Sequence, residues 1–179
     1  YIDFGGGFGI PYFSEEHELD CCALKIGLKQ LFSENYHYLK NMRCVFKSGR
    51  FLTANASVFV TQVLYKKVSH LKYFLICDGG SNFHANSAFL GRRIRHNFPV
   101  KVLTKKTEEM TEQVTVTSPL CIPTDVIAQE VTLPKCGPGD YIIIEKLSAY
   151  GLTNSPVLFI SHSYPLEIFF ANNKWKVIE

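Results

Sequence analysis

The sequence lacks the features that would assign it to several large classes of protein. It contains no apolar run long enough to span a bilayer and no stretch with the pattern of a signal peptide. Its six cysteines include no C-x-x-C pair, and no histidine pair completes a zinc site, so we expect no metal. The net charge of +3 is small. The basic stretches at 91–96 and 103–109 have no interleaved aromatic residues, which indicates a solvated surface and no nucleic-acid binding.

The composition is that of a folded globular protein. Hydrophobic residues make up 46% and charged residues 20% of 179 residues, which excludes a disordered or collagen-like chain. A chain of this length can bury a core without disulfides, so we expect reduced thiols and a cytoplasmic location. The chain starts at Tyr1, inside a predicted strand and without a methionine. We therefore expect a fragment, or a chain whose N-terminal part is missing.

The predicted elements divide the chain near residue 50. Residues 1–5 predict a strand, 19–34 a helix with a wide buried face, and 42–47 a second strand, which is the order of a β/α unit. Short segments rich in Val, Thr, Phe and Tyr follow, separated by turn residues, which predicts an all-β sandwich or barrel. The predicted strands are 51–68, 71–78, 98–103, 112–118, 125–133, 140–146, 156–162 and 166–170, with a short helix possible only within 84–95.

Residues 5–7 are three consecutive glycines directly after the first predicted strand, and a fourth stands at 9. Glycine costs about 0.5–1 kcal/mol in regular structure, so such a run usually meets a backbone requirement. It is not a Walker loop, because no Gly-Lys-Ser/Thr follows, and not a dinucleotide fingerprint, because IPYF intervenes before any helix. A tight turn with positive φ and a backbone cradle for a phosphate both explain the glycines.

Four further positions could carry chemistry, and each also has an ordinary structural interpretation. Arg50, after Gly49, could bind a phosphate or lie on the surface of a turn. Cys121 lies between two prolines on a stiff loop, where a thiol could transfer a proton or be inert. Asp125 could orient that loop. Tyr150, at a strand-to-loop transition, could contact a phosphate or a ring, or lie at the edge of the core.

The order of these motifs is more informative than any one of them. Between residue 1 and about residue 170 the chain contains, in this order, DFGGGFGIPYF, SGRFLTANASVFVTQVLYKK, CDGG, PLCIPTDVI, LPKCGPGDYIII and SAYGLTNSP followed by FISH. In this order they resemble the C-terminal part of the fold-type III pyridoxal-phosphate-dependent decarboxylases, the family of ornithine and diaminopimelate decarboxylases. The resemblance is strongest to the branch that acts on carrier-linked or unusual amino acids.

The resemblance implies an α+β protein with two parts. Residues 1–50 would be the last β/α units of a TIM-type barrel that binds the cofactor pyridoxal 5'-phosphate. Residues 51–179 would be an antiparallel β-sandwich or Greek-key barrel domain that carries active-site loops at a dimer interface. The residues implied to bind the cofactor phosphate are Gly5, Gly6, Gly7, Arg50 and Tyr150.

The implied reaction is the decarboxylation of an amino acid. The substrate forms an imine with the cofactor and loses CO₂ while the pyridine ring accepts the electrons. Cys121, contributed across the dimer interface, then protonates the substrate carbon. Asp125 is implied to belong to the same catalytic group, and Asp78 to lie near the substrate. The implied partners are an amino-acid substrate, carrier-linked in the most similar branch, and a second copy or a complementing N-terminal barrel segment.

Two departures from the family pattern affect catalysis. The family's Schiff-base lysine motif is absent, so we expect it before Tyr1 or in another chain. Lys47 stands where the family's E-P-G-R element has its glutamate, and a lysine there disfavours a protonated pyridine nitrogen by charge repulsion. Two alternatives therefore stay open: a catalytically inactive homologue that acts as a regulatory or structural partner subunit, and an amino-acid racemase of similar architecture.

Overall fold

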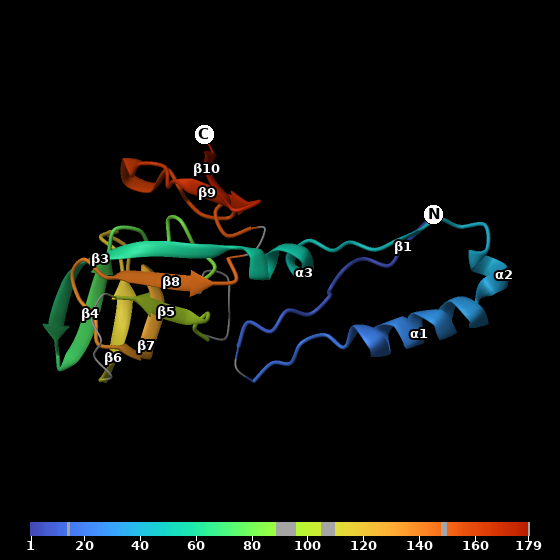
Figure 1. Ribbon diagram of the computed structural model, residues 1–179, viewed down its shortest axis with the longest axis horizontal. Helices are drawn as coiled ribbons and strands as arrows, with labels where there is room; N and C mark the ends of the chain where they lie inside the picture. Colours follow the sequence, from blue (N-terminus) through green and yellow to red (C-terminus); the bar gives the residue numbers. More distant parts are fainter. Residues whose placement is uncertain (14, 89–95, 105–109, 148–149, 179) are drawn as a thin grey trace.

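The computed structural model describes residues 1–13, 15–88, 96–104, 110–147 and 150–178. Figure 1 shows a curled sheet and an extension formed by the first fifty residues. The elements in chain order are β1 (Ile2–Asp3), α1 (Cys21–Glu34), α2 (Tyr36–Leu39), β2 (Cys44–Val45), α3 (Arg50–Thr53), η1 (Ala54–Ala56), β3 (Val58–Ser69), β4 (Lys72–Cys77), β5 (Val100–Leu103), β6 (Thr111–Thr117), β7 (Val126–Pro134), β8 (Tyr141–Glu145), η2 (Phe159–Ser161), β9 (Glu167–Ala171) and β10 (Lys174–Ile178).

The N-terminal extension is a strand–helix–strand unit. β1 and β2 pair in parallel, and α1 and α2 connect them (Figure 1). The Asp20 carboxylate caps α1 by accepting hydrogen bonds from the N–H groups of Cys22 and Ala23 at 2.8 and 2.9 Å. The predicted β/α order is confirmed, although both strands are shorter than the predicted 1–5 and 42–47.

The predicted burial of α1 is wrong for the described part of the chain. No residue of α1 is buried. Leu24, Leu28 and Phe32 share one face, as the spacing predicted, but this face lines an open groove of about 600 Å³. Phe32 packs edge-to-face on Phe4 with ring centroids 6.0 Å apart. Periodicity identifies the apolar face of a helix and does not say what covers it.

Strands β3 to β8 form a nearly closed barrel, and β9 and β10 form a separate hairpin. The sheet has the order β5-β8-β3-β4-β6-β7, and its edge strands β5 and β7 contact each other. The Asn97 side chain helps to join these edges, because its amide exchanges two hydrogen bonds of 2.8 Å with the backbone of Gln129. The predicted β domain is thus confirmed as a barrel. It is not purely antiparallel, because β4 and β6 pair in parallel while the other neighbours in the sheet are antiparallel.

The core lies inside this barrel. Alternation along β8 is typical: Ile142 and Ile144 are fully buried, whereas Tyr141 is exposed. From the neighbouring strands Val63 and Leu75 join them in the interior. The interior of the barrel is therefore filled mainly by aliphatic side chains.

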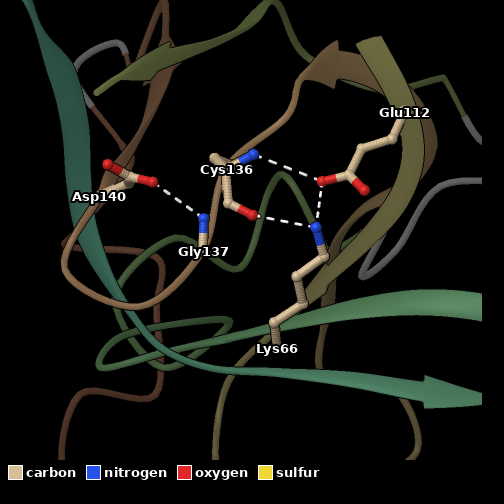
Figure 2. Close-up of polar contacts among 5 residues, drawn as sticks. All are labelled: Lys66, Glu112, Cys136, Gly137 and Asp140. Atoms are coloured by element: carbon tan, nitrogen blue, oxygen red, sulfur yellow. Dashed lines mark hydrogen bonds and ion pairs between the residues drawn. The ribbon is translucent and has the colours of Figure 1, made fainter. Parts of the chain in front are cut away.

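An ion pair fixes the connection between β7 and β8 to the rest of the barrel. Figure 2 shows Lys66 from β3 in contact with the carboxylate of Glu112 from β6. Lys66 also donates to the carbonyl of Cys136 at 3.0 Å, and Glu112 accepts from the N–H of Cys136 at 3.3 Å. The Asp140 carboxylate accepts from the N–H of Gly137 at 2.8 Å, which closes the turn. These contacts join β3 and β6 to the connection between β7 and β8 at this end of the barrel.

Three strand and helix predictions need correction. The strand predicted at 156–162 is a set of turns ending in η2, since Ile160 and Ser161 have φ of 48° and 63°. The strand predicted from 51 begins only at Val58, because 51–56 form short helical turns. Residues 84–88 of the possible helix are in turns, and the rest of that segment lies outside the described residues.

The C-terminal hairpin was predicted only in part. The strand predicted at 166–170 corresponds to β9, and its partner β10 was missed. Asn172 and Asn173 form the turn with φ of 51° and 57°, a geometry that asparagine tolerates and that the dipeptide could have indicated. Among the described helices, none has the length and apolar character to cross a membrane.

Candidate functional site

The parallel pairing of β1 and β2 brings two loops together. The carboxyl ends of parallel strands meet at one edge, so the glycine loop at 5–9 lies beside the segment 47–50. A 2.6 Å hydrogen bond from the N–H of Lys47 to the carbonyl of Gly5 joins them. Two motifs about forty residues apart in the sequence therefore form one structural unit.

The three glycines are required for two different reasons. Gly5 and Gly7 have φ of +75° and +86°, in the left-handed region that disfavours other residues. Gly6 is required by close approach, because a Cβ there would lie 2.7 Å from the carbonyl oxygen of Lys47. The turn with positive φ suggested by the sequence thus holds for Gly5 and Gly7, and Gly6 is required by a contact with Lys47 that the sequence did not suggest.

A cavity of about 530 Å³ opens between the glycine loop, the segment 47–51 and Tyr150. The Arg50 guanidinium lies 5.5 Å from the centre of the Tyr150 ring. The Tyr150 hydroxyl lies beside Gly49, 3.6 Å from where a Cβ would stand. Gly6, Gly7, Arg50 and Tyr150 line the cavity, and Gly5 supports the loop beneath them.

Asp3 is a site residue that the sequence interpretation missed. Its carboxylate accepts from the N–H of Gly5 at 2.7 Å and pairs with the Lys47 ammonium at 2.8 Å. The hydrogen bond from Lys47, together with that from Gly5, lowers the pKa of the Asp3 carboxyl. The same contact raises the pKa of Lys47. The position of an aspartate two residues before the glycine run was the available signal.

The cavity is suited to an anion. Arg50 and Lys47 both line it, and the described lining residues include no carboxylate. Asp3 offsets the charge of Lys47 from outside the lining. A guanidinium, a tyrosine hydroxyl and glycine backbone are together able to bind an anion with several oxygens.

Asp125 lies in a second, separate cluster. One carboxylate oxygen accepts from the N–H and hydroxyl of Ser118 at 2.9 and 2.6 Å. The other accepts from the N–H and hydroxyl of Ser81 at 3.1 and 3.0 Å. Asp125 is only 4% exposed. A buried carboxylate with four donors holds loops in place, so the geometry supports the predicted orienting role and offers no atom of Asp125 to a substrate.

Cys121 and Asp78 lie near this cluster and not at the cavity. Cys121 is exposed in the loop between Ser118 and Asp125. One Asp78 oxygen accepts from the Thr61 hydroxyl at 2.6 Å. None of these residues lines the cavity within one chain. The structure therefore separates the predicted site residues into a cavity group and a loop group.

The neighbouring Cys77 is unreactive by environment. Burial, and then the charge of Asp78, raise the pKa of its thiol to about 12. The described residues include no disulfide and no group of His, Cys, Asp and Glu side chains able to hold a metal ion.

Comparisons with known proteins find relatives in the family that the sequence motifs resemble. The model described as "Pyridoxal-dependent decarboxylase, C-terminal sheet domain" matches residues 13–148. The L-glutamyl-[BtrI acyl-carrier protein] decarboxylase of Niallia circulans is 39% identical over 99% of this chain and 42% of the relative. The diaminopimelate decarboxylase of Helicobacter pylori is 28% identical over 99% of this chain and 41% of the relative.

A solved structure agrees with the fold. The crystal structure of diaminopimelate decarboxylase from Helicobacter pylori complexed with L-lysine superposes with a TM-score of 0.81 at 27% identity. The match covers 98% of this chain and 40% of that one. The chain thus spans about two fifths of the length of the relatives that it matches.

Proposed function

Because the chain belongs to the family of pyridoxal-dependent decarboxylases and carries their C-terminal sheet domain, we propose that it is the C-terminal part of an amino-acid decarboxylase that uses pyridoxal 5'-phosphate. The observation that carries this proposal is the cavity that joins the glycine loop to Arg50 and Tyr150. These residues come from three separate stretches of the sequence, and each was implied by the family pattern.

The cavity residues fit the phosphate of the cofactor. In the described part of the chain, no carbonyl or side chain accepts a hydrogen bond from the N–H groups of Gly6 and Gly7. Gly6, Gly7, Arg50 and Tyr150 all line the cavity, so two N–H groups, a guanidinium and a hydroxyl are available as donors there. Together with Gly5, which holds the loop against Lys47, they would bind a phosphate dianion.

The remaining residues of the site have narrower roles. When bound, pyridoxal phosphate supplies an electron-accepting ring that stabilises the charge left on the substrate carbon. The exposed thiol of Cys121 would donate the proton that this carbon requires. Asp125 would hold the Cys121 loop, and the exposed carboxylate of Asp78 would contact the substrate amine. Since these groups do not line the chain's own cavity, they would act in the cavity of a second copy.

The architecture of the whole protein follows from the same reasoning. Residues 1–50 would be the end of the cofactor-binding β/α barrel of TIM type, a proposal supported by the parallel β1–α1–β2 unit. Residues 51–179 would be the sheet domain that carries the interface loops. The barrel's other units, the Schiff-base lysine and a homodimer partner, or a complementing N-terminal segment, would complete the enzyme.

The proposed substrate is an α-amino acid attached to a carrier. The support is the 39% identity to the Niallia circulans relative, which is named as a decarboxylase of a carrier-bound glutamyl group, against 28% for the diaminopimelate decarboxylase. We also propose a cytoplasmic location, in keeping with six cysteines that form no disulfide among the described residues.

A catalytically inactive partner subunit is the second candidate function. The observation that favours it is Lys47, which lines the cavity at the position where the family pattern has a glutamate. A cation at this place would disfavour a protonated pyridine nitrogen. This candidate keeps the phosphate site and predicts binding without decarboxylation.

The first experiment is a titration of the purified chain with pyridoxal phosphate, followed by absorbance and fluorescence. We expect saturable binding that inorganic phosphate competes away and that Gly6→Ala weakens at least about tenfold, since the new Cβ displaces the loop. Gly27→Ala is the matched control, because its Cβ would contact nothing in α1. Absence of saturable binding would contradict both candidates.

The second experiment separates the two candidates. The full-length protein is loaded with the cofactor, reduced with borohydride and weighed as intact protein, and CO₂ release from carrier-linked and free amino acids is measured. Cofactor mass on a lysine with CO₂ release supports the decarboxylase. Binding of the cofactor that inorganic phosphate competes away, without cofactor mass on a lysine and without CO₂ release, supports the inactive partner subunit.

A further inference from the structure

A buried segment at 79–88 connects the two groups of site residues. It follows β4, and most of its side chains are buried, including the fully buried Ser81 and Ser87. At its start, Ser81 donates to Asp125 beneath the Cys121 loop. At its middle, it contacts the turn that carries Tyr150.

Ser155 makes the contact with the Tyr150 turn. Its hydroxyl oxygen accepts from the N–H of Ala85 at 2.9 Å and donates to the carbonyl of Gly151 at 2.6 Å. The Asn154 N–H donates to the carbonyl of Tyr150 at 3.1 Å, which closes the turn. One hydroxyl therefore ties the residue next to Tyr150 to the buried segment.

The place of the Tyr150 ring depends on this turn. Tyr150 is 48% exposed, so packing fixes its ring only in part. Its neighbour Gly151 is tightly held, since a Cβ there would lie 2.8 Å from the carbonyl oxygen of Leu147. The backbone of the turn thus decides whether the Tyr150 hydroxyl reaches the cavity beside Gly49.

We propose that Ser155 is a positioning residue that holds the Tyr150 hydroxyl toward the anion bound in the cavity. The inference rests on the proposed function in identifying that anion as the cofactor phosphate. Removal of the hydroxyl leaves the buried N–H of Ala85 without its acceptor and releases the carbonyl of Gly151. The turn then relaxes, and Tyr150 loses its alignment with the phosphate.

The test compares ligands with and without a phosphate on the full chain. Pyridoxal phosphate and pyridoxal are titrated by fluorescence into the unsubstituted protein, Ser155→Ala, Ser155→Thr, Tyr150→Phe and the Ser155→Ala/Tyr150→Phe double variant. We expect Ser155→Ala to lower the affinity for pyridoxal phosphate about three- to tenfold, the range of one hydrogen bond, and to leave pyridoxal affinity unchanged. Ser155→Thr, which keeps the hydroxyl, retains the affinity.

The double variant decides whether Ser155 acts through Tyr150. If it does, Ser155→Ala causes no further loss in the Tyr150→Phe background. An equal loss in that background, or an equal loss of pyridoxal affinity, would show general damage and overturn the inference. Unchanged affinity of Ser155→Ala for pyridoxal phosphate overturns the inference about Ser155 and leaves the proposed phosphate site standing. No saturable binding by the unsubstituted chain overturns the phosphate site itself and the inference with it.

Discussion

Replacement of Asp125 by asparagine tests the reading of this residue as the structural centre of the Cys121 loop. Asparagine has almost the same shape as aspartate, so the substitution leaves no cavity. It replaces one carboxylate oxygen by an NH₂ group and removes the charge. Each oxygen of Asp125 now accepts two hydrogen bonds, one pair from Ser118 and one pair from Ser81.

The expected loss follows from these four hydrogen bonds. The amide oxygen can keep one pair, but those two bonds change from a charged to a neutral acceptor, at a cost of about 1 kcal/mol each. The NH₂ group faces the other serine, whose hydroxyl can rotate and whose backbone N–H cannot. That buried N–H loses its acceptor, which costs about 1–3 kcal/mol. The free energy of unfolding should fall by about 3–5 kcal/mol, a large part of the roughly 5–15 kcal/mol of a typical domain.

Urea denaturation followed by circular dichroism measures this loss. Asp78→Asn is the matched control: its single accepting oxygen survives as the amide oxygen, so the bonds from Thr61 and Gln62 persist. We expect the control to lose about 2 kcal/mol at most, because its two bonds also change to a neutral acceptor while no buried N–H loses its acceptor. If Asp125→Asn lost no more than Asp78→Asn, the four-donor account of Asp125 would be wrong.

Two further predictions concern buried groups of the barrel. The pKa of the Cys77 thiol is about 12 in the folded protein and 9.0 in the ordinary state, so above pH 9 the thiol ionises more readily in the unfolded chain. The free energy of unfolding should therefore fall as the pH rises above 9, and Cys77→Ala should remove this part of the fall. Between pH 8 and pH 10 the free energy of unfolding should fall by about 1.4 kcal/mol more in the unsubstituted protein than in Cys77→Ala. Urea denaturation at the two pH values measures this difference. Lys66→Met should cost about 3 kcal/mol, because it leaves the largely buried carboxylate of Glu112, 11% exposed, without its cationic partner. The Lys66→Met/Glu112→Leu double variant should recover part of this loss in the same melts, and a larger loss in the double variant would refute the ion-pair account.

Much of the site could be predicted from the sequence because its chemistry depends on local residue types. The glycine run at 5–7 indicates a backbone requirement by composition alone. The order of the motifs around Arg50, Cys121 and Tyr150 resembles the family to which the chain belongs. The β/α order of the first fifty residues and most strands of the barrel followed from periodicity.

The tertiary structure decided which of these residues meet and what each one does. Parallel pairing of β1 with β2 places Gly6 against the carbonyl of Lys47. The sequence suggested that Asp125 orients its loop, but only the fold supplies Ser81 from a distant loop as a donor to it. The contact between Ser155 and Ala85 is likewise visible only in the folded chain.

The sequence by itself determined the residue types, the backbone freedom of the glycine loop and the apolar faces, since these depend on neighbours along the chain. Only the folded chain decided the burial of each carboxylate, the pairing of Asp3 with Lys47 and the separation of the cavity from Cys121. The physical reason is that solvation and hydrogen-bond satisfaction are properties of contacts between distant segments, which local pattern does not encode.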